Sequence, residues 1–294
     1  MSRNFTPTIL PPDPHTRKPS FGMPQGACDA HCHVFGPASR YPYAPDRTYT
    51  PPDAPLEAFQ RLQEILGIDR AVLVNASCHG LDNAPVLDAI AASKGRYHGV
   101  ANVDDSFSDS DLLGLHKGGI RGCRFNFVRH LGGVPDMDVF DRVIAAIAPL
   151  GWHVVLHFDA QDIESHVEFL TRLPVVYVID HMGRVQAGRG LEQPAFQSLL
   201  GLMRRDEKCW VKVCGAERVS TAGPPFLDAV PFAQALIETA PHRILWGTDW
   251  PHPNVRVMPN DGDLVDLVPL FAPDPALQEL VLVTNPARLY GFAP

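Results

Sequence analysis

The sequence predicts an α/β protein with one domain, a distorted (β/α)8 TIM barrel. Three observations support this fold class. The chain has 294 residues, and one such barrel needs roughly 250 residues plus insertions. Short apolar runs alternate with amphipathic stretches along most of the chain, which is typical of β/α repetition. The strand-like runs are apolar throughout, which favours a parallel sheet covered by helices.

The elements follow in order after a proline-rich leader over residues 1–24, and the barrel is expected over 25–294. Strands are predicted at residues 27–34, 70–76, 97–103, 120–127, 153–158, 175–182, 210–215 and 243–250. Helices are predicted at residues 56–66, 84–93, 109–116, 138–150, 163–173, 194–204, 232–239 and 275–283. An open doubly wound sheet also alternates strands and helices, but it usually has about five to seven strands and often a glycine-rich first turn. The barrel is therefore favoured.

Composition limits the function classes. The formal net charge is −8, which argues against nucleic acid or an anionic membrane as partner, because both are bound by dense Lys and Arg. We find neither a signal peptide nor an apolar run of about 20 residues, so we expect a cytoplasmic protein, a monomer or small homo-oligomer. The six cysteines form no CxxC pair, and we expect buried, reduced thiols.

Candidate catalytic residues cluster at the ends of predicted strands. In the run DAHCHVFG, strand alternation places His31 and His33 on the same face. His157, His181 and Asp249 lie at the ends of the fifth, sixth and eighth strands. These ends converge at one mouth of a barrel, where catalytic groups of this fold lie. Four imidazoles and a carboxylate suit zinc and similar ions, so the five residues form a candidate metal site.

Several motifs resemble the 2-pyrone-4,6-dicarboxylate lactonase family of the amidohydrolase superfamily: DAHCHVFGP, VNASCHGLDNA, GGIRGCRFNF, VIDHMGR, WGTDWPHPN and VTNPARLYGF. The resemblance extends from about residue 26 to the C-terminus. It implies a distorted (β/α)8 barrel and a carboxylic ester hydrolase that opens a small anionic lactone in aromatic-compound degradation. The expected reaction converts 2-pyrone-4,6-dicarboxylate to 4-oxalomesaconate, also written 4-carboxy-2-hydroxymuconate. The family also works without a metal.

The resemblance implies roles for individual residues of this chain. Those at catalytic positions are His31, His33, His181 and Asp249, and those at substrate-binding positions are Tyr49, Ser77, Arg124 and Arg218. Two positions depart from the family pattern. The run RFNFVRH places Arg129 and His130 where the family has a second carboxylate-binding arginine, and His157 replaces a tyrosine. We therefore count these three as further substrate contacts. Because His157 completes the metal-ligand set, we expect one divalent ion, zinc, with a metal-free site as the alternative.

The predicted mechanism uses Asp249 as the base that accepts a proton from water, with the histidines stabilising the oxyanion directly or through the metal. Arg124 and Arg218 are expected to bind substrate carboxylates, because a guanidinium matches the two oxygens. Three alternatives stay open. They are a metal-dependent lactonase for another anionic lactone such as a sulfomuconolactone, a decarboxylase of the same superfamily, and a non-catalytic barrel that binds a small molecule.

Overall fold

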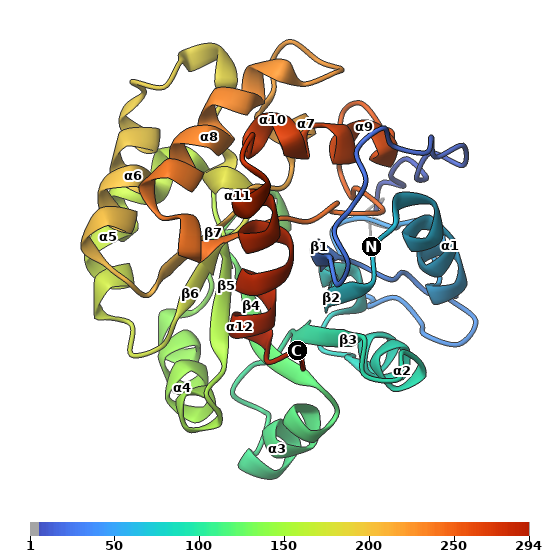
Figure 1. The fold of residues 1–294 in the computed structure, drawn as a ribbon. Coiled ribbons are helices and arrows are strands. Elements are labelled where there is room, and N and C mark those ends of the chain that lie inside the picture. The colour runs from blue at the N-terminus through green and yellow to red at the C-terminus, as the bar shows by residue number, and fades with distance from the viewer. Residues whose placement is uncertain (1–5, 294) are drawn as a thin grey trace.

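The structure is a computed structural model that describes residues 6–293, and it confirms the predicted (β/α)8 barrel (Figure 1). Eight parallel strands are hydrogen-bonded in sequence order. Their bounds are β1 Cys28–Cys32, β2 Arg70–Val74, β3 Tyr97–Ala101, β4 Ile120–Asn126, β5 His153–His157, β6 Tyr177–Ile179, β7 Cys209–Lys212 and β8 Ile244–Leu245. The predicted strands 175–182 and 243–250 are longer than β6 and β8, because the chain turns out of strand geometry where each reaches the mouth.

Irregular backbone closes the barrel between β8 and β1. Beyond Leu245 the chain still follows β1, since the Ala30 N–H donates to Trp246 O at 2.9 Å and the Asp249 N–H donates to His31 O at 2.8 Å. These backbone hydrogen bonds alone place Asp249 beside the two histidines of the first strand.

Helices surround the strands in Figure 1. Their bounds are α1 Leu56–Leu66, α2 Ala84–Ala92, α3 Asp109–Lys117, α4 Met137–Ile147, α5 Ile163–Arg172, α6 Pro194–Arg205, α7 Ala216–Val219, α8 Val230–Thr239, α9 Asp261–Asp266, α10 Val268–Phe271, α11 Pro275–Glu279 and α12 Asn285–Tyr290. The predicted helix 275–283 instead continues through α12. Pro286 lacks an N–H, and a π-helical turn over Leu280–Thr284 precedes it. This C-terminal stretch packs where β8 and β1 meet.

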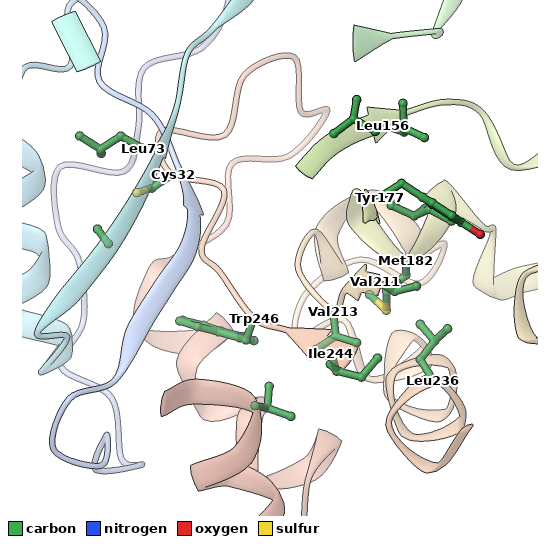
Figure 2. Packing of buried hydrophobic residues seen from close by; sticks show 14 of the residues in the cluster. Cys32, Leu73, Leu156, Tyr177, Met182, Val211, Val213, Leu236, Ile244 and Trp246 are labelled. Carbon is green, nitrogen blue, oxygen red and sulfur yellow. The ribbon is translucent and has the colours of Figure 1, made fainter. Parts of the chain in front are cut away.

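Side-chain alternation along the strands divides the core in two. One set, inside the barrel, contains small and branched side chains from the strands, closed off by Tyr290 and Phe292. The other set points outward against the helices. Figure 2 shows part of this second set, including Val211, Ile244 and Leu236 of α8. Inward positions farther along the same strands reach the mouth, where they become polar.

A β-bulge in β1 changes which residues face inward. Asp29 pairs with Ala71 and Cys32 with Leu73, so the step from 29 to 32 on β1 faces a step of two residues on β2. Ala30 belongs to the inner core, whereas Cys32 belongs to the outer one. Bulges of this kind re-aim side chains and are common beside active sites. Here the bulge turns the side chains of His31 and His33 into the mouth.

Two remaining expectations concern the cysteines and the membrane. All six cysteines are buried with free thiols, as expected. In the described part of the chain, no helix has both the length and the apolar character needed to cross a bilayer.

Candidate active site

A buried charge cluster forms the floor of the mouth. Asp180 follows β6, and it lies 3.2 Å from Lys212 Nζ of β7, 3.2 Å from Arg124 Nε of β4 and 3.2 Å from His31 Nδ1 of β1. Lys212 Nζ also lies 2.9 Å from His31 Nδ1. Lys212 and Arg124 form close ion pairs with Asp180, and none of the three contacts has the angles of a hydrogen bond. The floor is therefore held by charge, with one member from each of four strand ends.

The ionisation of this floor follows from burial and its neighbours. Burial alone would raise the pKa of the Asp180 carboxyl, but Lys212, His31 and Arg124 together hold it well below its usual range. Burial, assisted by the Lys212 ammonium, lowers the pKa of His31 to about 3. At neutral pH the cluster therefore consists of a carboxylate, two cations and a neutral imidazole.

Asp249 stands above this floor, surrounded by the three predicted catalytic histidines. Its Oδ1 lies 3.4 Å from His31 Nε2, 3.4 Å from His33 Nε2 and 4.0 Å from His181 Nε2. The far nitrogens of two rings are fixed, since His33 Nδ1 contacts Val74 O at 2.8 Å and His181 Nδ1 contacts the Cys214 thiol at 3.2 Å. Asp249 itself has a left-handed φ of 66°, a conformation that is concentrated at functional sites. The structure thus brings the four predicted catalytic residues together.

Arg218 holds the other oxygen of Asp249. Its Nε and Nη2 lie 2.7 and 2.5 Å from Asp249 Oδ2, and Nη2 also donates to Pro253 O at 2.8 Å. Burial would raise the pKa of Asp249, but Arg218, followed by the histidines, lowers it well below its usual range. Asp249 is therefore ionised at neutral pH before the reaction, and much of the donor capacity of Arg218 is already used within the protein.

His157 lies between two arginines. Arg124 Nη2 is 3.0 Å from its Nδ1, and Arg184 Nη1 is 3.1 Å from its Nε2. Asn126 Oδ1 is 3.1 Å from Nδ1. Burial and the Arg124 guanidinium hold the pKa of His157 well below 6.5, so the ring is neutral. A neutral ring has one lone pair, so only one of the two arginines can donate to it, and the tautomer of the ring sets which one.

A cavity of about 20 Å³, here called the inner cavity, lies over Asp249. The predicted residues in its wall are His33, Tyr49, Ser77, Arg124, His130, His157, His181, Arg218 and Asp249. His31 is completely buried beneath them. Arg129 is exposed on the short helix Arg129–Leu131 and is not part of the wall. The structure thus brings all predicted site residues together except Arg129.

Part of this site fits a divalent ion. His31, His33 and Asp249 offer ligand atoms within 4.8 Å of one another, as do His31, Asp180 and His181, and also Glu217, Asp249 and His252. His31 Nε2 is buried without a hydrogen-bond partner among the described residues. The 3.4 Å spacings to Asp249 match the edge of a ligand tetrahedron with bonds of about 2.0–2.2 Å. His157, a member of the predicted ligand set, is absent from these groups.

Sequence reasoning missed three residues that contact the predicted set: Asp180, Lys212 and Arg184. A signal was present for the first two, because each is a charged residue within or directly after an apolar strand-like run. Charged side chains are almost never fully buried unless they are paired. Arg184 carried no such signal, since it lies in the turn that begins at His181 and the residues that it contacts come from other strands.

The comparisons with known proteins show the family of the chain. A model of the amidohydrolase family matches residues 28–292. The chain belongs to this family. It is 47% identical to a 2-pyrone-4,6-dicarboxylate hydrolase of Comamonas testosteroni, over 93% of this chain and 92% of that protein. It is 43% identical to a 4-sulfomuconolactone hydrolase of Hydrogenophaga intermedia, over 97% and 95%. The resemblance predicted from the motifs is therefore confirmed.

A solved structure from Acinetobacter baumannii extends the comparison. It is a probable 2-pyrone-4,6-dicarboxylic acid hydrolase with citric acid bound. The TM-score is 0.80 at 28% identity, and the match covers 91% of this amidohydrolase and 100% of that chain. The fold is therefore shared with a protein whose solved structure contains bound citric acid.

The buried ion cluster leads to a stability prediction. In Lys212→Met the Asp180 carboxylate loses its ammonium partner inside the barrel, and we expect the free energy of unfolding to fall by about 3–5 kcal/mol. Arg142→Met, which breaks the exposed pair with Asp105, is the matched control and should cost about 0–1 kcal/mol. Urea denaturation measures both. Equal losses in the two variants would contradict a floor held by charge.

A second buried cluster predicts a pH dependence. His252 Nε2 lies 3.0 Å from Asp261 Oδ1 and its Nδ1 3.8 Å from Glu217 Oε1. Burial opposes protonation of His252, but Asp261 and Glu217 outweigh it and raise its pKa to about 10. An unfolded histidine titrates near 6.5. The protonated ring therefore contributes stability that is complete below about pH 6.5 and is lost as the pH rises toward about 10.

We expect His252→Gln to flatten the decline of the free energy of unfolding between about pH 6.5 and 10. Urea denaturation across this range measures the slope. The same cysteines titrate in both proteins, so the difference between the slopes reports on His252. His242→Gln, at an exposed position, should keep the wild-type slope. Identical slopes in all three proteins would show that His252 gains no proton affinity on folding.

Proposed function

We propose that this amidohydrolase is a lactonase that hydrolyses 2-pyrone-4,6-dicarboxylate to 4-carboxy-2-hydroxymuconate. One observation carries the proposal: a carboxylate surrounded by three imidazoles, with arginines in the same wall. Asp249 Oδ1 faces His31, His33 and His181 at 3.4–4.0 Å, and Arg124 lines the same cavity. The similarity to a 2-pyrone-4,6-dicarboxylate hydrolase supports the choice of substrate.

In the proposed reaction Asp249 accepts a proton from a water that attacks the lactone carbonyl carbon. The carbonyl oxygen becomes an oxyanion, and imidazole N–H groups stabilise it. The ring C–O bond then breaks, and the leaving oxygen departs as an enolate that afterwards gains a proton. Arg218 keeps Asp249 ionised and oriented through its two contacts with Oδ2. Arg124 pairs with a substrate carboxylate at the cavity wall.

We also propose that the site holds one zinc ion, through His31, His33 and Asp249 with His181 beside them. A bound zinc would polarise the carbonyl and lower the pKa of a water. His157 is not needed for this set, since its ring nitrogens face Arg124 and Arg184. The six buried, unpaired thiols are consistent with a reducing compartment, and we infer a cytoplasmic location.

Loss of the pyrone ultraviolet absorbance tests the reaction. We expect turnover by the wild-type protein and a decrease of about 10²–10⁴-fold in kcat for Asp249→Asn. 4-Sulfomuconolactone and a neutral sugar lactone are the comparison substrates, the first because a relative is named for its hydrolysis. Good turnover of the neutral lactone alone would contradict an anionic substrate. Binding of the pyrone without turnover in both proteins would indicate a binding module.

Elemental analysis tests the ion. Protein purified without chelators should contain about one zinc per chain, and His33→Asn should lower this occupancy. His157→Tyr is the matched control and should retain the zinc, because its ring contacts arginines in the structure. Full activity of metal-free protein in the presence of chelator would show that the four residues act without an ion.

A further inference from the structure

Two cavities of very different size meet at the barrel mouth. The inner cavity over Asp249 has a volume of about 20 Å³, close to the space of one water. A second one, the outer cavity, has a volume of about 450 Å³, within the range of small-molecule sites. Arg218 and Asn254 line both. A ring with two carboxylates exceeds the inner cavity, so part of such a substrate must occupy the outer one.

The turn after β6 places Arg184 in the wall of the outer cavity, in contact with His157 of the inner cavity. His181, Met182, Gly183 and Arg184 all have left-handed φ values, of 52°, 53°, 65° and 53°. Such a conformation costs roughly 1–2 kcal/mol for each residue other than glycine, and strain of this kind is concentrated at functional sites. Within this turn His181 reaches Asp249, while Arg184 lines the outer cavity.

Arg184 has donors to spare. Its Nη1 contacts His157 Nε2 at 3.1 Å, and its Nε lies 3.2 Å from Asp159 Oδ1. Within residues 6–293 the structure gives Nη2 no hydrogen-bond acceptor. The Arg184 side chain is only 24% exposed and that of Asp159 is 25% exposed, so both partners of this ion pair are partly desolvated. An incoming carboxylate or sulfonate would complete its hydrogen bonding.

The other arginines are less suited to a second anion. Arg124 is paired with Asp180, and Arg218 is paired with Asp249. Arg129, the anchor suggested by sequence position, is exposed and lies outside both cavities. Arg189 and Arg256 line the outer cavity, but both are exposed to solvent, which weakens any ion pair they make.

We propose that Arg184 binds the second anionic group of the substrate in the outer cavity and thereby selects doubly charged lactones. This inference rests on the proposed lactonase function. Arg124 would bind the carboxylate nearer the reacting carbonyl, and Arg184 the carboxylate farther out. The contact between Arg184 and His157 accounts for an imidazole between two arginines. The neutral His157 ring lies between Arg124 and Arg184 and keeps their guanidinium groups apart.

Steady-state kinetics of Arg184→Met, Arg184→Lys and Arg129→Met test the proposal. The substrates are 2-pyrone-4,6-dicarboxylate, 2-pyrone-4-carboxylate and 2-pyrone-6-carboxylate. With the dicarboxylate, Arg184→Met should raise KM at least about 30-fold with a smaller change in kcat, and Arg184→Lys should recover part of the loss. One of the two monocarboxylates lacks the carboxylate that would lie in the outer cavity. With that substrate, the KM of Arg184→Met should stay within about threefold of wild type. Arg129→Met, the matched control, should do so with all three.

If Arg184→Met raised KM equally for all three substrates, the proposal would be overturned, since Arg184 would then only support His157. A large effect of Arg129→Met on the dicarboxylate would overturn it in favour of Arg129. Calorimetric titration with citrate separates this inference from the proposed reaction. Citrate should bind wild type and bind Arg184→Met at least about 30-fold more weakly.

If citrate binding depends on Arg184 but no pyrone is hydrolysed, the reaction fails and the anion site stands. If citrate binds both proteins equally, the anion site fails whatever the reaction. If wild type neither binds citrate nor hydrolyses any pyrone, both proposals fail.

Discussion

The buried carboxylate of Asp180 is the constraint on which the rest of the site depends. An isolated carboxylate inside a barrel is prohibitively unfavourable, and here Lys212, Arg124 and His31 compensate it at 3.2 Å each. Each of these groups comes from a different strand. The spacing of the strands therefore fixes the floor of the mouth, and the floor fixes the positions of His31 and Arg124.

The floor also decides what His31 can do. Its Nδ1 faces both Lys212 Nζ at 2.9 Å and Asp180 Oδ1 at 3.2 Å. When Nδ1 accepts from Lys212, Nε2 carries the hydrogen and serves as a donor to an oxyanion. When Nδ1 carries the hydrogen beside Asp180, Nε2 presents a lone pair to a metal, as ligating histidines commonly do. Direct hydrogen-bond catalysis and metal binding therefore require different tautomers of the His31 ring.

Sequence patterns were sufficient where the signal is local. Strand alternation placed His31 and His33 on one face, and the ends of the strands placed His181 and Asp249 beside them. The inward direction of these histidines, however, depends on the bulge in β1, which leaves no mark in composition. His157 shows the same limit, since its residue type suits a metal. The two guanidinium groups that face its nitrogens come from β4 and from the turn after β6, and only the fold brings them there.

The arginines proposed to bind anions were the hardest residues to predict, because residues close in the sequence are not always close in the structure. Arg129 follows the motif that contains Arg124, yet the short helix after β4 carries it to the surface. Arg184 lies 55 residues farther along the chain but meets His157 in the wall of the mouth. It can do so because the strained left-handed turn starts at His181, directly after Asp180. The same buried charge that orders the floor thus anchors the turn that carries the outer arginine, so the inner and outer parts of the mouth are set by one residue.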